Sequence, residues 1–456
     1  MMPTFYMGSG FVDSILSEEG RVRNQVVTAG CLALFCLSAP LLAQVAFDES
    51  PDALHERAVN LARQEKYTEA ISILDSILAN DPKNYPVQRD YIIISTWMGR
   101  CDVALARYEK IKKHPDQETY LITPIAQCLA DEGKAEAALD MLTDANRRSG
   151  DEESQDALRQ IKLRFALDRR PVFDAAAATT KSDAGARDWF FSARLKTKIN
   201  DRAAWYARFL HARADDPKFE TGDFHRLGVG IIYGINRNVT LIEDLAAEMD
   251  GGSSFGSTTT LVLTPSVSLQ GQLELATFAE DVPLRARALG IDAHRFTASA
   301  NYHTLDYRWD AAGGAAFYDF SDGNNRHALN GSLGYAFELA PRREQRIVGG
   351  VYHTGNTLDN TVYYNPERDL SMTLTYKLDL VYESKFPRHV DHVYAHVGSY
   401  AQAGVNPFPI YGLRYEQDYD LNEATSLTWG AALRQSVYDG NREFEANFNV
   451  SVSRKL

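Results

Sequence analysis

The sequence predicts an α + β membrane protein in which N-terminal helical repeats precede a 16-stranded antiparallel transmembrane β-barrel. Three observations predict this fold class. An apolar segment near the N-terminus has the pattern of an export signal, the next part of the chain repeats every 34 residues, and the remainder alternates apolar and polar residues in long strands. The expected boundaries within the 456 residues are 1–46, 47–170 and 171–456.

The composition restricts the kind of partner. The net charge is −13, and the chain has four cysteines. An acidic chain is poorly suited to nucleic acid, and so few cysteines do not form a disulfide scaffold. We therefore expect no nucleic-acid partner, and a partner that is polycationic, neutral or proteinaceous.

The first segment has the parts of an export signal. Arg21 and Arg23 precede the apolar run VVTAGCLALFCLSAPLLAQ, in which Ala43 is a small residue near the exit. This order is typical of a Sec signal peptide, so we interpret 1–46 as an N-terminal extension with a signal peptide. A membrane anchor is the alternative because the run approaches spanning length, but Pro40 and the polar chain after it favour cleavage.

Three repeat units follow the signal, at 51–84, 85–118 and 119–152. Two sets of positions superpose at this period, namely Ala70, Ala104 and Ala138, and Leu74, Tyr108 and Leu142. Small residues at fixed offsets let antiparallel helices approach closely, as in tetratricopeptide (TPR) repeats. We therefore expect a periplasmic TPR α-solenoid that docks a partner or a polymer, with a spacer as the alternative.

Two cysteines fall within these repeats. Cys101 opens the second helix of the second repeat, and Cys128 lies late in the first helix of the third repeat. Those helices are antiparallel neighbours, so the two sulfur atoms can meet in an oxidising compartment. A disulfide and two unpaired core cysteines both remain open.

Long strands occupy the rest of the chain. SMTLTYKLDLVYE (371–383) alternates for about a dozen residues, with Lys377 and Asp379 on its polar face. Further polar-face residues come from the strands at 411–421 and 426–438, namely Arg414, Glu416, Asp418, Asp420 and Arg434. We expect the apolar faces to meet outer-membrane lipid and the charged faces to line a wet lumen, with a soluble sandwich or propeller as the alternative.

The connections predict the number of strands. Longer polar stretches, such as 215–222, 280–293, 356–369, 402–409 and 438–443, alternate with short ones such as NDR and DLNE. This asymmetry is typical of outer-membrane barrels. Fifteen strands are clear, but an odd number would place the N-terminal end of the first strand on the wrong side of the membrane. A sixteenth strand is therefore expected near PVFDAAAATTK (171–181).

Four stretches carry a resemblance to a known family. DFSDGNNR (319–326), VPLRARALGI (282–291), VYYNPERD (362–369) and QSVYDGNREFE (435–445) resemble the PgaA/HmsH-type porins that export poly-β-1,6-N-acetyl-D-glucosamine. The resemblance covers nearly all of 50–456, although the family's helical domain is longer. The motif positions, expected in loops, are Pro283, Arg285, Asp319, Phe320, Asp322, Gly323, Asn324, Arg326, Tyr438, Asp439, Gly440 and Arg442.

The resemblance implies a function. It implies passage of a partly deacetylated amino-sugar exopolysaccharide across the Gram-negative outer membrane during biofilm formation. It also implies contact between the repeats and a periplasmic polysaccharide deacetylase. Such a polymer is cationic, so Glu416, Asp418 and Asp420 could attract it. Alternatively, the carboxylates only solvate the lumen and pair with Arg414 and Lys377.

Other functions remain open. The chain could export another exopolysaccharide, cellulose-like or alginate-like, or be a non-transporting outer-membrane TPR scaffold. For an enzyme, the visible candidates are His353, His392 and His396 with nearby serines. His392 and His396 share a strand face but are too far apart for one metal ion without help. We therefore expect no enzyme, no cofactor and no metal.

Overall fold

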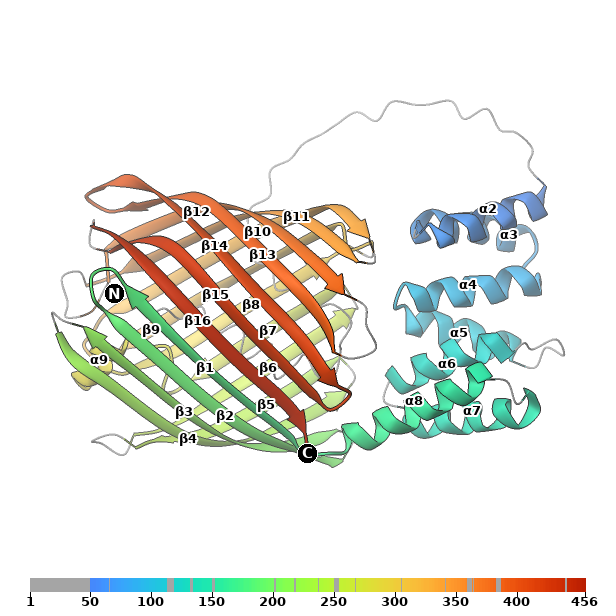
Figure 1. The fold of residues 1–456 in the computed structure, drawn as a ribbon, viewed down its shortest axis with the longest axis horizontal. Helices are drawn as coiled ribbons and strands as arrows, with labels where there is room; N and C mark the ends of the chain where they lie inside the picture. Colours follow the sequence, from blue (N-terminus) through green and yellow to red (C-terminus); the bar gives the residue numbers. More distant parts are fainter. Residues whose placement is uncertain are drawn as a thin grey trace. The chain divides into compact units, whose positions relative to one another are not determined.

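The computed structural model describes residues 50–456 except 65, 113–118, 132–133, 150–151, 201, 217–218, 237, 250–253, 267, 305, 341, 359–362, 364, 383–386 and 439–440. The expected signal peptide therefore lies outside the described residues. The chain divides between Asp168 and Arg169 into a helical unit and a β-barrel (Figure 1). Among the described residues, no helix has both the length and the apolar character of a membrane span.

The helical unit consists of antiparallel helix pairs. Its described helices are α2 (Pro51–Arg63), α3 (Tyr67–Asn80), α4 (Tyr85–Trp97), α5 (Cys101–Ile111), α6 (Thr119–Asp131), α7 (Ala135–Ser149) and α8 (Glu152–Asp168). Helices α2, α4 and α6 begin at the first residues of the three predicted repeats. Side chains of Ser50 and Asn84 cap α2 and α4 by accepting hydrogen bonds from Ala53 N and Val87 N, each at 3.2 Å.

The repeat positions form the contacts between these helices. Ala70, Ala104 and Ala138 are all fully buried, so a side chain larger than alanine would force the paired helices apart. The matching large residues Leu74, Tyr108 and Leu142 are buried beside them. The predicted TPR-like repeat is therefore confirmed. A disulfide joins Cys101 in α5 to Cys128 in α6.

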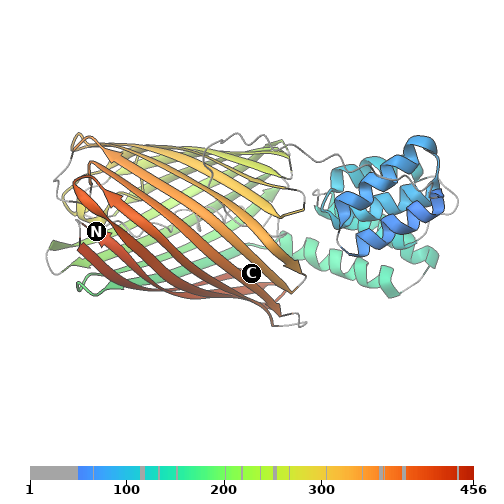
Figure 2. The same ribbon diagram turned by 90° about the horizontal axis from the view of Figure 1, so that it is seen from above.

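The second unit is a closed antiparallel barrel of sixteen strands, in which each strand pairs with the next and β1 pairs with β16 (Figures 1 and 2). The strands are β1 (Val172–Ser182), β2 (Arg187–Asn200), β3 (Ala203–Asp216), β4 (Phe219–Asn236), β5 (Val239–Glu248), β6 (Phe255–Ser266), β7 (Leu269–Ala276), β8 (Ala293–His303), β9 (Trp309–Phe320), β10 (Asn325–Ala340), β11 (Arg343–Asn356), β12 (Arg368–Tyr382), β13 (Arg388–Gln402), β14 (Val405–Asn422), β15 (Thr425–Tyr438) and β16 (Asn441–Lys455). Strand β1 is the predicted sixteenth strand.

The two ends of the barrel differ. One end carries the connections from each odd-numbered strand to the next strand, such as β1–β2 and β3–β4, and we call it the loop end. We call the opposite end the turn end. The long connections, 249–254, 277–292 and 357–367, all lie at the loop end. The prediction of longer loops at 215–222, 402–409 and 438–443 is wrong, because β4, β14 and β16 begin at Phe219, Val405 and Asn441. Strands β4 and β16 begin with mostly polar residues, and β14 begins with VNPFP, which contains two prolines, so these ends lack the period-two pattern.

Strand alternation separates two environments. On β12, Met372 and Leu374 are 56% and 53% exposed, whereas Lys377 and Asp379 are 9% and 6% exposed. The exposed apolar side chains form the outer face of the barrel, and the charged ones crowd together on the concave inner face. An apolar exterior is stable only against lipid.

The disulfide gives a test of the helical unit. Because Cys101 and Cys128 close a loop with a sequence separation of 27, we expect their replacement by alanine to lower the free energy of unfolding by about 2–4 kcal/mol. Titration of the denatured, unreduced chain from residue 47 onward should detect no free thiol. Two free thiols per chain would show that the bridge does not form.

Candidate functional site

The charged residues predicted on β12 and β14 form a connected network on the inner face. Lys377 Nζ lies 3.1 Å from Asp379 Oδ2, and Asp379 Oδ1 lies 2.7 Å from His392 Nδ1 on β13. His392 Nε2 lies 3.3 Å from Asp418 Oδ2 on β14. Thr428 on β15 donates a hydrogen bond to Asp418 at 2.6 Å. One chain of polar contacts thus crosses four strands.

The remaining predicted lumen residues lie beside this network. Arg414 forms an ion pair with Glu416, and Arg434 Nε lies 2.5 Å from Glu445 Oε2 on β16. Asp420 is opposite Arg388 in the register of β13 and β14. Lys377 and Arg414 pair with Asp379 and Glu416, as the alternative expects in which the carboxylates only solvate the lumen and pair with these two bases.

Three partners in this region were missed by sequence reasoning. His392 was expected to be a lumen or rim residue and not a catalytic one, but its role as a bridge between two carboxylates was not predicted. Tyr394 places its ring 5.1 Å from the Arg414 guanidinium and 5.4 Å from Lys377 Nζ, and Glu445 pairs with Arg434. All three lie on inner faces, but their partners are on neighbouring strands, so only the register identifies them.

The histidines do not form one catalytic group. His392 and His396 are on the inner face of β13. His353 occupies the outer face of β11, because its neighbour Thr354 is buried on the inner face and Val351 is exposed. The ring of His353 contacts the backbone oxygen of Asp369 at 2.6 Å.

A segment at the loop end folds inward. Residues 277–292, which contain α9 (Leu284–Ala288), join β7 to β8 (Figure 1). Phe278 packs with Leu210, Ala212 and Phe224 on the inner faces of β3 and β4. A Cβ atom on Gly222 of β4 would lie 2.8 Å from the backbone oxygen of Leu284, so only glycine permits this approach. We call 277–292 the inner loop.

Ion pairs attach the inner loop to the wall. Glu280 Oε1 lies 2.5 Å from Arg208 Nη2 on β3 and 3.2 Å from Arg226 Nε on β4. Asp281 Oδ2 lies 2.6 Å from Arg295 Nη1 on β8, and it accepts a hydrogen bond from the Tyr318 hydroxyl at 2.5 Å. Two adjacent carboxylates therefore bind two separate parts of the wall, β3–β4 and β8–β9.

One of these arginines, Arg208, is itself held by the wall. Arg208 Nη2 also lies 2.6 Å from Asp244 Oδ1 on β5, and Tyr206 donates a hydrogen bond to Asp244 at 2.8 Å. Arg226 contacts the inner loop a second time, because it donates a hydrogen bond to the backbone oxygen of Phe278 at 3.0 Å. Because Asp244 holds Arg208 independently of the inner loop, docking of Glu280 on Arg208 needs little additional ordering of that side chain.

The electrostatics of the inner loop favour docking. Burial alone would raise the pKa of Glu280, but Arg208 and Arg226 outweigh burial and lower this pKa to about 2. Burial lowers the pKa of Arg287 in α9 to about 10, and Glu248, 3.7 Å away, opposes that decrease. Both side chains are therefore charged at neutral pH.

Three of the four family motifs meet at the loop end. Phe320, Val282 and Tyr363, one from each motif, are buried in one apolar cluster. Asn324 is fully buried and donates a hydrogen bond to the Tyr363 hydroxyl at 3.0 Å. Its side-chain oxygen accepts from the backbone N of Leu358 at 3.1 Å. These motif residues hold the connections together.

Several motif positions are in strands, which corrects the expectation that all lie in loops. Asp319 and Phe320 end β9, Arg326 is in β10, Tyr438 ends β15 and Arg442 is in β16. Polar rim residues can extend a strand beyond the apolar band, so their polarity did not indicate a loop. Pro283 precedes α9, Arg285 lies in α9, and Asp322 and Gly323 form the β9–β10 turn, where Gly323 has a φ of +89°. Asp439 and Gly440 lie outside the described residues.

Comparisons with known proteins agree with this architecture. The profile of the family described as "PgaA membrane beta barrel domain" matches residues 174–453. Two curated relatives, from Escherichia coli strain K12 and Escherichia coli O157:H7, carry the name poly-beta-1,6-N-acetyl-D-glucosamine export protein. Each is 25% identical over 173 residues, which are 37% of this chain but only 21% of the relative.

One solved structure is similar in fold. The protein titled "Bacterial polysaccharide outer membrane secretin" superposes with a TM-score of 0.58 at 20% sequence identity. The match covers 63% of this chain and 99% of that chain. At this identity the match shows the fold alone.

The inner loop can be displaced by one substitution. We expect Gly222→Ala to push Leu284 away from the wall and to increase single-channel conductance, at a cost of about 1–3 kcal/mol in stability. Gly271→Ala on β7 is the control, because its Cβ would be 3.6 Å from the nearest atom, an ordinary contact. Equal conductance of both variants and the wild type would show that the inner loop does not narrow the pore.

Acid should release the same loop. The pKa of Glu280 is depressed by folding, so its stabilisation is complete above the ordinary glutamate value near 4.5 and is lost as pH falls toward 2. We therefore expect conductance per channel to rise when the pH is lowered through this range. The Glu280→Gln variant should start at the higher conductance and show a smaller rise. Identical pH profiles would contradict the role of Glu280.

Proposed function

The chain belongs to the PgaA membrane β-barrel family, and from this premise we propose that it exports partly deacetylated poly-β-1,6-N-acetyl-D-glucosamine through its barrel. The observation that carries the proposal is the charged lumen. Among the inner-face residues described above on β12 to β16, the five carboxylates Asp379, Glu416, Asp418, Asp420 and Glu445 outnumber the four lysine and arginine residues Lys377, Arg388, Arg414 and Arg434. The barrel is an outer-membrane protein. Its sixteen strands give a diameter large enough for an aqueous channel.

The chemistry of the lumen suits an amino-sugar polymer. Deacetylated glucosamine units carry ammonium groups, which carboxylates attract, whereas acetylated units present hydroxyl and amide groups. The Asp418 side chain is 51% exposed although it contacts His392, so it remains accessible to a passing chain. Ion pairs along the wall offer donors and acceptors without one deep binding site, which allows a polymer to move.

We assign the helical unit to the periplasm, where it docks the polymer or a polysaccharide deacetylase. TPR arrays commonly bind a partner along their concave surface. Docking there would bring newly deacetylated polymer close to the transport route. This part of the proposal rests on the repeat architecture and on the family resemblance, and we place no catalytic step on the chain itself.

Two other functions make different predictions. A neutral cellulose-like polymer would be insensitive to the lumen carboxylates, and an anionic alginate-like polymer would be repelled by them. A non-transporting scaffold would give no conductance. The most direct experiment deletes the gene and identifies the polysaccharide that is no longer exported. Loss of a β-1,6-linked glucosamine polymer supports the proposal, and loss of a different polymer contradicts it.

Three carboxylates allow the mechanism to be tested. In the variant with Glu416→Gln, Asp418→Asn and Asp420→Asn, side-chain size and polarity are kept and three negative charges are removed. We expect normal heat-modifiable folding, a lower cation preference in bilayer conductance and reduced polymer export, because charge in a low-dielectric channel acts strongly on ions.

The matched control removes charge from the outer face. Glu243 and Asp391 lie there, where they contact Thr259 at 2.6 Å and Gln417 at 2.7 Å. The variant with Glu243→Gln and Asp391→Asn should keep the wild-type cation preference. If the lumen variant folds and its ion preference and export equal those of the wild type, these carboxylates only solvate the pore.

A further inference from the structure

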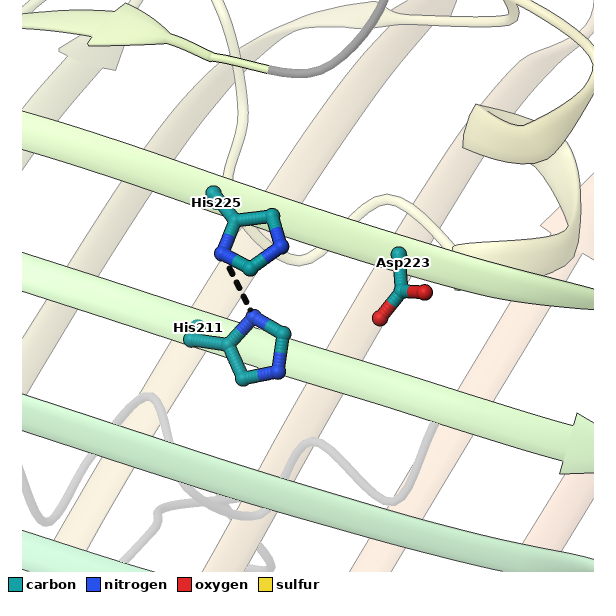
Figure 3. Close-up of side chains that lie close together, drawn as sticks. All are labelled: His211, Asp223 and His225. Atoms are coloured by element: carbon teal, nitrogen blue, oxygen red, sulfur yellow. Dashed lines mark hydrogen bonds between the residues drawn. The ribbon is translucent and has the colours of Figure 1, made fainter.

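Two histidines and an aspartate come together on neighbouring strands near the loop end (Figure 3). His211 on β3 is directly opposite His225 on β4 in the strand register. Their Nδ1 atoms are 2.7 Å apart, and the stacked rings have centroids 4.0 Å apart. Asp223 precedes His225 by two residues and shares its face. One ligand atom from each residue lies within 4.8 Å of the others.

This cluster is outside the lumen. On β4, Phe224 and Arg226 are 1% exposed on the inner face, whereas Leu227 and Val229 are 52% and 55% exposed on the outer face. His225 and Asp223 continue the outer series toward the loop end. The apolar side chains from Leu227 to Ile235 thus give way to polar ones at His225, which is the level of lipid headgroups in a membrane barrel. The proposed polymer path does not include these residues.

We propose that His211, His225 and Asp223 form a binding site for a divalent transition-metal ion of the zinc class. Imidazole nitrogen and carboxylate oxygen are zinc ligands, and three such ligands leave the fourth tetrahedral position open for water. Two nitrogens bound to one zinc ion lie about 3.4 Å apart, given Zn–N distances near 2.0–2.1 Å. The Nδ1 atoms therefore need only a small ring rotation to admit the ion.

Surrounding side chains already orient the ligands. The ring of Trp189 on β2 has its centroid 4.3 Å from that of His211 and covers it, so that His211 is only 8% exposed. Arg213 Nη1 lies 3.4 Å from Asp223 Oδ2. Because a carboxylate has two oxygens, Asp223 can keep this pair and offer Oδ1 to the cation. Such outer partners commonly set the orientation and affinity of metal ligands.

Arg213 does not depend on Asp223 alone. Its Nη2 lies 3.1 Å from Asp215 Oδ1, and Asp215 accepts a hydrogen bond from Thr221 at 3.0 Å. The arginine is therefore held whether or not Asp223 turns toward a cation. The positive charge of Arg213 also partly neutralises the negative charges of Asp215 and Asp223 next to the lipid.

The site has a structural consequence. A cation bound to His211 and His225 would link β3 to β4 on the outer face. The inner faces of the same strands carry Arg208 and Arg226, which bind Glu280 of the inner loop. The metal would therefore stabilise the part of the wall on which the inner loop docks, while remaining separate from the pore.

Zinc binding to the full-length mature chain in detergent tests the inference. The protein is freed of any histidine tag, stripped with a chelator and titrated with Zn²⁺ by calorimetry. We expect one zinc ion per chain. The His211→Asn and Asp223→Asn variants should each bind roughly tenfold more weakly, or worse. Asp223 is exposed, so Asp223→Asn keeps the test independent of whether a histidine change disturbs folding.

A second histidine pair provides the control. His327 and His353 also lie on the outer face near the loop end, with ring centroids 5.6 Å apart. His327→Asn should leave zinc affinity unchanged. Co²⁺ should give the visible absorption of a tetrahedral site in the wild type and in His327→Asn, but not in His211→Asn. Absence of binding to the wild type, or equal binding by folded wild type and Asp223→Asn, overturns the proposal.

Discussion

Pairing of β1 with β16 closes the sheet, and the separation of lipid and lumen faces follows from this closure. Backbone N–H and C=O groups that face hydrocarbon must be paired within the protein, so a membrane-embedded sheet cannot leave an open edge. The pairs from Val172↔Lys455 to Ser182↔Glu445 remove that edge. Once the sheet is closed, strand alternation alone decides which side chains meet lipid and which meet the lumen.

Closure also explains why the lumen is crowded with ion pairs. Side chains on a concave surface converge, so charges from adjacent strands come within contact distance, as Asp379, His392 and Asp418 do. The same crowding supplies Arg208 and Arg226 to the inner loop. The pore is thus shaped by electrostatic contacts, whereas the helical unit is held together by small buried residues such as Ala104.

The sequence predicts what depends on periodicity within one segment. Alternation assigned Lys377 and Asp379 to the inner face, the 34-residue period located α2, α4 and α6, and the requirement for an even strand number located β1. It could not predict what depends on register between segments. His392 as a bridge, Glu445 as the partner of Arg434 and Glu280 as the attachment of the inner loop each need the three-dimensional pairing of distant residues.

The rims were the hardest regions to predict. The strands that begin at Phe219, Val405 and Asn441 start with polar or proline-containing stretches in which no period-two alternation remains. For the same reason, motif residues such as Phe320 and Arg326 were expected in loops although they end or begin strands. Polar composition at a barrel rim therefore does not indicate where strand pairing stops.

We propose above that the barrel lumen is a passage for an amino-sugar polymer. The most direct measurement records single channels of the purified chain in a planar bilayer while short β-1,6-linked glucosamine oligomers are added to the turn end. We expect an open channel whose current is interrupted reversibly, more often by deacetylated than by fully acetylated oligomers and less often at high salt. A barrel that conducts no ions, or an open channel that neither oligomer blocks, would contradict the proposed passage of the polymer.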